Sequence, residues 1–110
     1  MAATEDAPIT ILALDIGASR IKAALVGPDG NRLAELRRPT MRDDGPAAVL
    51  TRVADVAAEL AGLTDTTISR AGLAVCGAVG QDGLVTAVNL GWEAEPVGTA
   101  VADRLGLPVT

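Results

Sequence analysis

The stretch ITILALDIGASRIKAALVGPDG, residues 9–30, decides how the fold begins. Residues 9–14 form a nearly continuous apolar run, which predicts a strand covered on both faces. Residues 15–19 predict a tight polar turn, and a second strand follows with apolar residues at Ile21, Ala23, Leu25 and Val26. The sequence GPDG at 27–30 is a strong turn signal, so the second strand is expected to turn back there into a third, neighbouring strand.

The sequence after residue 30 extends the sheet and then changes to a helical period. A third strand is predicted at 32–38 with Leu33 and Leu36 as its apolar anchors, which completes a three-stranded antiparallel meander. After a polar connection, Pro46 predicts the first position of a helix, where its missing N–H costs nothing. An apolar stripe at helical spacing follows, and Gly62 predicts the helix end; the stripe consists of Leu50, Val53, Val56, Ala57 and Leu60.

The second half of the chain predicts one helix between strands. Residues 71–76 read as a buried strand, and a small hairpin follows with its turn at 81–83 and a loop at 89–92. A second helix is predicted from Pro96 to Gly106, with Val97, Ala100, Val101 and Leu105 on one face. Residues 107–110 resemble the beginning of a strand. A meander followed by helix-strand-helix predicts the α/β class.

Composition narrows the function classes. The 110 residues allow one domain or a piece of one, and their single aromatic residue leaves Ala, Val, Leu and Ile to build the core. A net charge of −5 without a basic cluster does not favour nucleic-acid binding. The absence of histidine leaves acid–base chemistry to carboxylates or lysine. The lone Cys76 excludes a disulfide within the chain and a multi-cysteine zinc site, and it suits a reducing cytoplasm.

The turn at 15–19 carries the strongest chemical signal. Asp15 follows a buried strand, Gly17 allows close backbone approach, and Ser19 adds a hydroxyl beside backbone N–H groups that can cradle phosphate. Mg²⁺ prefers oxygen ligands and keeps several waters, so Asp15 would hold it directly or through water. An ordinary hairpin turn would also select aspartate and glycine. The position after the first strand, ahead of a strand that carries Lys22, favours the functional interpretation.

Four segments together resemble the ROK (repressor, open reading frame, kinase) family of sugar kinases. LALDIGASRIKAALVGPDG at 12–30 is similar to the family's first phosphate motif, and GLAVCGAV at 72–79 to the segment that closes its next strand. GLVTAVNLGWEAEPVG at 83–98 resembles its sugar-side loop, and LGLPV at 105–109 the lead-in to its catalytic strand. The resemblance implies the ribonuclease-H-like, actin-like ATPase fold. It makes 9–110 an incomplete N-terminal nucleotide- and sugar-binding domain after a disordered tail at 1–8.

The resemblance also implies a function and its residues. We expect the full-length parent to be a cytoplasmic, glucokinase-like enzyme that transfers phosphate from ATP to a hexose without nucleic acid or membrane as partner. A homo-oligomer and a monomer are both compatible with the resemblance. ATP and Mg²⁺ would be bound by the residues of the first motif, which are Asp15, Gly17, Ala18, Ser19 and Arg20, with Asp15 as the metal ligand. Gly77 and Asn89 would contact the sugar. Many family kinases have Gly-Thr-Lys where this chain has Ala18-Ser19-Arg20, and often proline where it has Cys76.

Several residues allow two interpretations. Asn89 is either a sugar-facing amide or a residue that caps a turn. Trp92 fits a packing anchor better than a sugar-stacking ring, and Lys22 is expected to flank the site or face solvent. At the level of the whole chain, the alternatives are a transcriptional regulator of the same family, a non-catalytic protein of the actin-like class, and a fragment without independent activity.

The family's catalytic Asp would follow Thr110, so no catalytic residue and no zinc site of the family is expected within this chain. We therefore expect the isolated 110-residue chain to have no sugar kinase activity. A coupled assay of ADP release in the presence of hexoses measures this directly. Sugar-dependent turnover well above background would contradict the expectation.

Overall fold

The computed structural model describes residues 9–110, and the tail predicted at 1–8 lies outside the described residues. The main sheet contains β1 (Thr10–Ile16), β2 (Arg20–Val26), β3 (Arg32–Pro39) and β4 (Ile68–Val75). Its helices are α2 (Pro46–Ala61) and α3 (Val97–Leu105). A small sheet contains β5 (Ala78–Val79), β6 (Val85–Ala87) and β7 (Trp92–Glu95), and two 3-10 turns are η1 (Arg42–Asp44) and η2 (Val88–Leu90).

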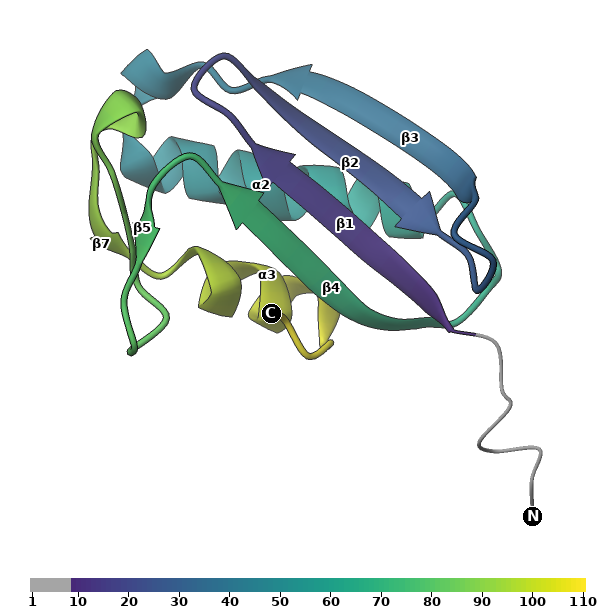
Figure 1. The fold of residues 1–110 in the computed structure, drawn as a ribbon. Helices are drawn as coiled ribbons and strands as arrows, with labels where there is room; N and C mark the ends of the chain where they lie inside the picture. Colours follow the sequence, from purple (N-terminus) through teal and green to yellow (C-terminus); the bar gives the residue numbers. More distant parts are fainter. Residues whose placement is uncertain (1–8) are drawn as a thin grey trace.

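The strand order of the main sheet is β3-β2-β1-β4. Strand β1 pairs antiparallel with β2 and parallel with β4, and β2 pairs antiparallel with β3. The parallel pair requires a crossover, which α2 supplies between β3 and β4. Because Ile16 is in register with Val75, the carboxyl ends of β1 and β4 lie at the same edge of the sheet (Figure 1).

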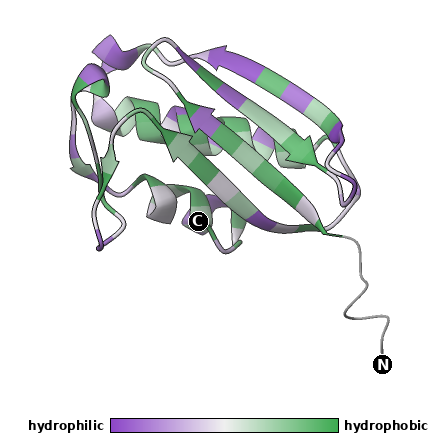
Figure 2. Ribbon diagram, in the orientation of Figure 1, coloured by the Kyte–Doolittle hydropathy of each residue, from purple (hydrophilic) through white to green (hydrophobic). Residues whose placement is uncertain are grey.

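Both helices cover one face of the main sheet, and the other face is turned toward the viewer in Figure 1. Strand residues alternate between the faces, so Leu12, Leu14 and Ile16 are buried against the helical layer. In Figure 2, β1 and β4 are mainly hydrophobic, whereas β3 at the edge of the sheet mixes hydrophilic and hydrophobic residues. The helical side of the core is completed mainly by α2, through Val49, Val53, Val56, Ala57 and Leu60.

One-sided covering corrects three expectations. The first strand is not covered equally on both faces, because Asp15 on its uncovered face is exposed. Leu33 does not anchor β3: it is 53% exposed, whereas Leu36 packs against the core. The two leucines are three residues apart and so point to opposite faces of a strand. Along β4, the predicted burial is complete only at Ala71.

Two boundaries also differ from the sequence-based expectation. Asp15 and Ile16 belong to β1 and not to the following turn, because both are paired with β2 and β4. Trp92 begins β7 and is not part of a loop, because it pairs with Ala87. In both places a tertiary pairing extends a strand into residues whose local sequence favours a turn.

Other predicted boundaries are confirmed. Pro46 begins α2, Gly62 caps it, and Gly106 ends α3 with a φ of 67°. Val109 forms a parallel bridge to Ala71, and the Thr110 N–H donates to the Ala71 carbonyl at 2.9 Å, so 107–110 does begin to pair with β4. Within residues 9–110, no helix has the length and apolar character needed to cross a membrane.

One-sided burial predicts unequal effects from two leucine truncations in neighbouring strands. Leu25 in β2 is 0% exposed, so Leu25→Ala should lower the unfolding free energy by about 2–5 kcal/mol. Leu33→Ala in β3 is the matched control and should change it by about 0.5 kcal/mol or less, because Leu33 lies on the solvent side. Urea denaturation followed by circular dichroism measures both, and equal losses would contradict the assigned faces.

Candidate functional site

Residues 17–19 join β1 to β2 at the edge where β4 also ends, and they are called the phosphate turn after the family motif that they resemble. The Gly17 N–H donates to the Arg20 carbonyl at 3.0 Å, which closes the turn. Thr40 makes two hydrogen bonds to this turn: its Oγ1 donates to the Gly17 carbonyl at 2.8 Å, and its N–H donates to the Ser19 carbonyl at 3.0 Å. Within the described part of the chain, the amide N–H groups of Ala18 and Ser19 make no hydrogen bond, so both are available to an anion.

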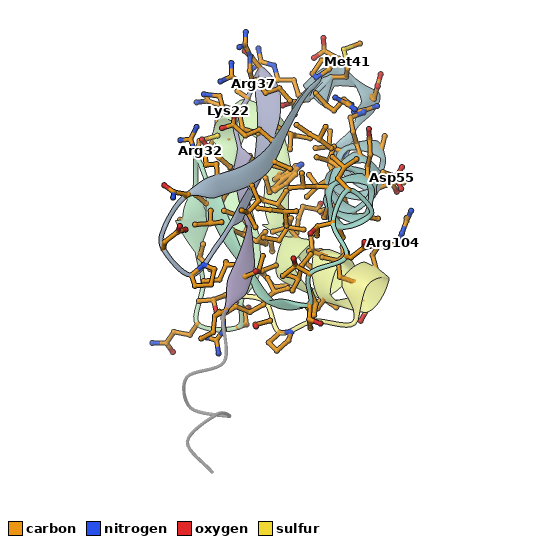
Figure 3. The ribbon with its side chains drawn as sticks, turned by 90° about the vertical axis from the view of Figure 1, so that its right-hand side faces the viewer. Lys22, Arg32, Arg37, Met41, Asp55 and Arg104 are labelled. Carbon is orange, nitrogen blue, oxygen red and sulfur yellow. The ribbon has the colours of Figure 1, made fainter. Side chains whose placement is uncertain are left out.

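Asp15 lies beside this turn on the uncovered face of the sheet. It is in register with Lys22 of β2, which is in turn in register with Arg37 of β3. Figure 3 shows Lys22 and Arg37 on the side of the sheet opposite the helices. One exposed carboxylate and two cations therefore form a row across three strands. A carboxylate in this setting fits Mg²⁺, which is usually held by one or two protein carboxylates, by waters and by substrate phosphate.

A broad concavity of about 760 Å³ lies on the sheet face that the helices leave uncovered. Asp15, Lys22 and Arg37 line it together with small apolar residues such as Ala24 and Gly72. Of the predicted site residues, only Asp15 lines this concavity. The hydrogen bonding of the phosphate turn, and not this concavity, therefore defines the candidate site. Among residues 9–110, no three acidic, histidine or cysteine side chains lie close enough together to hold a metal ion by themselves.

Asn89 lies in η2, at the end of the molecule where η1 also lies (Figure 1). The Arg42 guanidinium donates to the Asn89 main-chain carbonyl at 2.8 Å and so links the two turns. The Asn89 side chain is exposed and makes no hydrogen bond to any residue between 9 and 110, so it does not cap η2. Trp92 is only 2% exposed and belongs to the core, so it is a packing anchor and cannot stack on a sugar.

Gly77 follows β4, beside the phosphate turn, and has a structural reason to be glycine. Its N–H donates to the Val75 carbonyl at 2.9 Å, which makes a sharp turn at the end of β4. A Cβ atom at this position would lie 2.5 Å from the Thr86 carbonyl oxygen and 2.8 Å from the Ala87 Cβ. The close approach to β6 thus explains this glycine without a ligand, and its contact with a sugar stays a prediction.

The structure links the phosphate turn and η2, the two turns of the candidate site, through residues that the sequence did not single out. Thr40 reaches the phosphate turn, and Arg42, two residues later, reaches Asn89. Thr40 lies in the stretch that was predicted only as a polar connection, yet it is 0% exposed. No sequence signal marks either residue, because their partners lie 23 and 47 positions away in the chain.

Two glycine substitutions separate close packing from general backbone effects. Gly77→Ala should lower the unfolding free energy by about 1–3 kcal/mol, because the added methyl group overlaps main-chain atoms of β6. Gly72→Ala in β4 is the control: its Cβ would meet no atom within 4 Å, so the change should be within about 0.5 kcal/mol. Thermal and urea denaturation test the pair, and equal stability of both variants would refute the packing argument.

Comparison with known proteins adds the family. The ROK family model matches residues 11–110. A search of curated proteins gives no significant match. The ROK family glucokinase from Streptomyces griseus, solved with glucose and AMPPNP, superposes with a TM-score of 0.81 at 24% identity, over 92% of this chain and 32% of that one. The polyphosphate/ATP-glucomannokinase from Arthrobacter sp. strain KM gives 0.72 at 29% identity, over 93% and 43%.

Members with another role share this fold. A ROK family transcriptional regulator homologous to the E. coli MLC protein superposes with a TM-score of 0.64 at 20% identity, over 91% of this chain and 26% of that one. The chain spans 32%, 43% and 26% of the lengths of these three solved structures. The α/β class predicted from the sequence pattern is thus confirmed. The family model covers nearly all of the chain, and the chain belongs to the ROK family.

Proposed function

We propose that this chain supplies the first phosphate-binding turn and part of the sugar site of an ATP-dependent hexose kinase with glucokinase-like specificity. The observation that carries the proposal is the phosphate turn itself, whose carbonyls are bound by Thr40 while the Ala18 and Ser19 N–H groups are left for an anion. Membership of the ROK family and the fold shared with sugar kinases support the same function.

Phosphoryl transfer depends on positioning and charge neutralisation more than on covalent chemistry. In the proposal, the N–H groups of Ala18 and Ser19 contact phosphate oxygens, and the Ser19 hydroxyl adds a further donor. Asp15 holds Mg²⁺, directly or through water, and the ion would neutralise charge on the phosphates. The row of Lys22 and Arg37 beside Asp15 adds positive potential along the approach to the turn.

The proposed sugar contacts rest on η2, which carries Asn89, and on Gly77 after β4. The exposed Asn89 amide can both donate to and accept from sugar hydroxyls, and Gly77, whose N–H is bonded to Val75, offers its main-chain carbonyl as an acceptor. The base that deprotonates the accepting hydroxyl belongs, in this proposal, to sequence that follows Thr110. The described residues would then position the donor and part of the acceptor, and the base would complete the site.

Replacing Asp15 by asparagine tests the proposal in the full-length kinase. Asp15→Asn keeps the shape of the side chain but removes its charge, so kcat should fall by about 100-fold or more, as for other groups that neutralise developing charge. Steady-state kinetics with ATP and glucose measure the loss, and circular dichroism should show an unchanged fold because Asp15 is exposed.

Asp103→Asn is the matched control, since Asp103 is an exposed carboxylate on α3, and its kcat should stay near that of the unsubstituted enzyme. Near-normal turnover of Asp15→Asn would contradict the proposed role of Asp15 in binding Mg²⁺. Absence of hexose phosphorylation in the unsubstituted full-length protein would favour the regulator function instead.

A further inference from the structure

Residues 40–44, called here the bracket segment, lie between β3 and α2 and contact both turns of the candidate site. Thr40 binds the phosphate turn, and Arg42 binds the main chain at Asn89. The two contacts come from positions two residues apart in the chain. A short, well-anchored segment of this kind can fix the relative position of the turns that it joins.

Thr40 controls the direction of an amide in the phosphate turn. Its Oγ1 donates to the Gly17 carbonyl at 2.8 Å. A trans peptide is planar, with its C=O and N–H pointing in opposite directions, so this bond fixes the Ala18 N–H to point away from Thr40. That N–H is one of the two that the turn offers to an anion. Thr40 is 0% exposed and the bond is partly buried, which limits the competition from water.

The bracket segment is itself attached to α2. The guanidinium of Arg52 donates to the Thr40 carbonyl at 2.5 Å and to the Asp44 carboxylate at 2.8 Å. Arg52 stands on the long helix that packs against the sheet, and its side chain is only 28% exposed. Both ends of the bracket segment are thus bound to α2, whose apolar residues pack against the sheet.

Met41 redirects the chain between the two contacts. Its φ of 54° lies in the left-handed region, which costs a residue other than glycine free energy that neighbouring contacts must offset. This reversal lets Thr40 point into the core while Arg42 reaches η2. Met41 itself is 55% exposed, and Figure 3 places it at the outer end of the molecule. Its side chain therefore does not explain the conformation, whereas the bonds on both sides do.

We propose that the bracket segment sets the position of the phosphate turn relative to η2, the turn that carries Asn89, with Thr40 and Arg42 as positioning residues. The inference rests on the proposed kinase function, since it assigns these turns to donor and acceptor. A transfer reaction is sensitive to displacement of the reacting groups by as little as about 1 Å. Loss of the Thr40 contact should therefore act on the nucleotide, and loss of the Arg42 contact on the sugar.

Kinetics of the full-length kinase test the two roles separately. Thr40→Val keeps the volume but removes the hydroxyl, and it should raise the KM for ATP about two- to tenfold, the effect of one lost hydrogen bond, with the KM for glucose nearly unchanged. Arg42→Met should raise the KM for glucose by a similar factor and leave that for ATP nearly unchanged. Thr40→Ser and Arg42→Lys keep a hydrogen-bond donor and should bring both KM values most of the way back to those of the unsubstituted enzyme.

Two variants control for general effects of these substitutions. Thr51→Val removes an exposed hydroxyl on α2, and Arg104→Met removes an exposed guanidinium that pairs with Asp55 on the outer side of the helices (Figure 3). Neither residue contacts the two turns through a hydrogen bond in the described part of the chain. Both variants should leave both KM values unchanged.

Amide hydrogen exchange of the 110-residue chain supplies a readout that does not require activity. Thr40→Val should speed exchange at Gly17, whose N–H closes the phosphate turn, and Arg42→Met should speed it at Gly91, whose N–H is bonded to the Val88 carbonyl of η2. Selective effects on each turn, with rescue by Thr40→Ser and Arg42→Lys, are the expected result.

Three results would overturn the inference. One is unchanged exchange at both turns. Another is a uniform rise in exchange over the whole chain, which would mark a structural role only. The third is an active kinase in which both KM values change equally in each variant. A failure of the proposed function looks different, because the unsubstituted full-length protein would then phosphorylate no hexose.

Discussion

Parallel pairing of β1 with β4 is the constraint on which the rest of the structure depends. The two strands are joined by a crossover through α2, and a parallel pair can form only if that connection passes over one face of the sheet. The crossing helix must then bury its apolar stripe against the strands, which creates the core. The same pairing places the turns after β1 and β4 next to each other, so packing and the location of the site have one cause.

Covering of only one sheet face distributes the chemistry along the strands. Because side chains alternate, Leu14 and Ile16 are buried on either side of Asp15, and this fixes the backbone that carries the carboxylate. The same alternation on β2 and β3 places Lys22 and Arg37 in line with Asp15. Charged groups are therefore held on rigid strands. This lowers the entropy cost of ordering them when a ligand binds.

Hydrogen bonds from a distant segment complete the site where regular structure ends. The phosphate turn contains only three residues between β1 and β2, and Thr40 satisfies two of its carbonyls from a position next to β3. Thr40 is itself buried, and its hydroxyl and N–H need such partners, because an unpaired polar group in the core is costly. A stability requirement and the orientation of the Ala18 N–H are thus met by the same bond.

The sequence by itself determined the order of the main-sheet strands and the two helices, the helix starting at Pro46, the glycine stops, the hairpin turn and the family, because each depends on local conformational preference or on residues close together in the chain. Local signals could not reveal that Leu33 faces solvent, that Asp15 and Trp92 lie in strands, or that Thr40 and Arg42 reach the two turns. Strand faces, strand ends and long-range hydrogen bonds depend on which neighbour a strand acquires. Only the tertiary structure decides this, because the partners lie tens of residues away and share no local pattern.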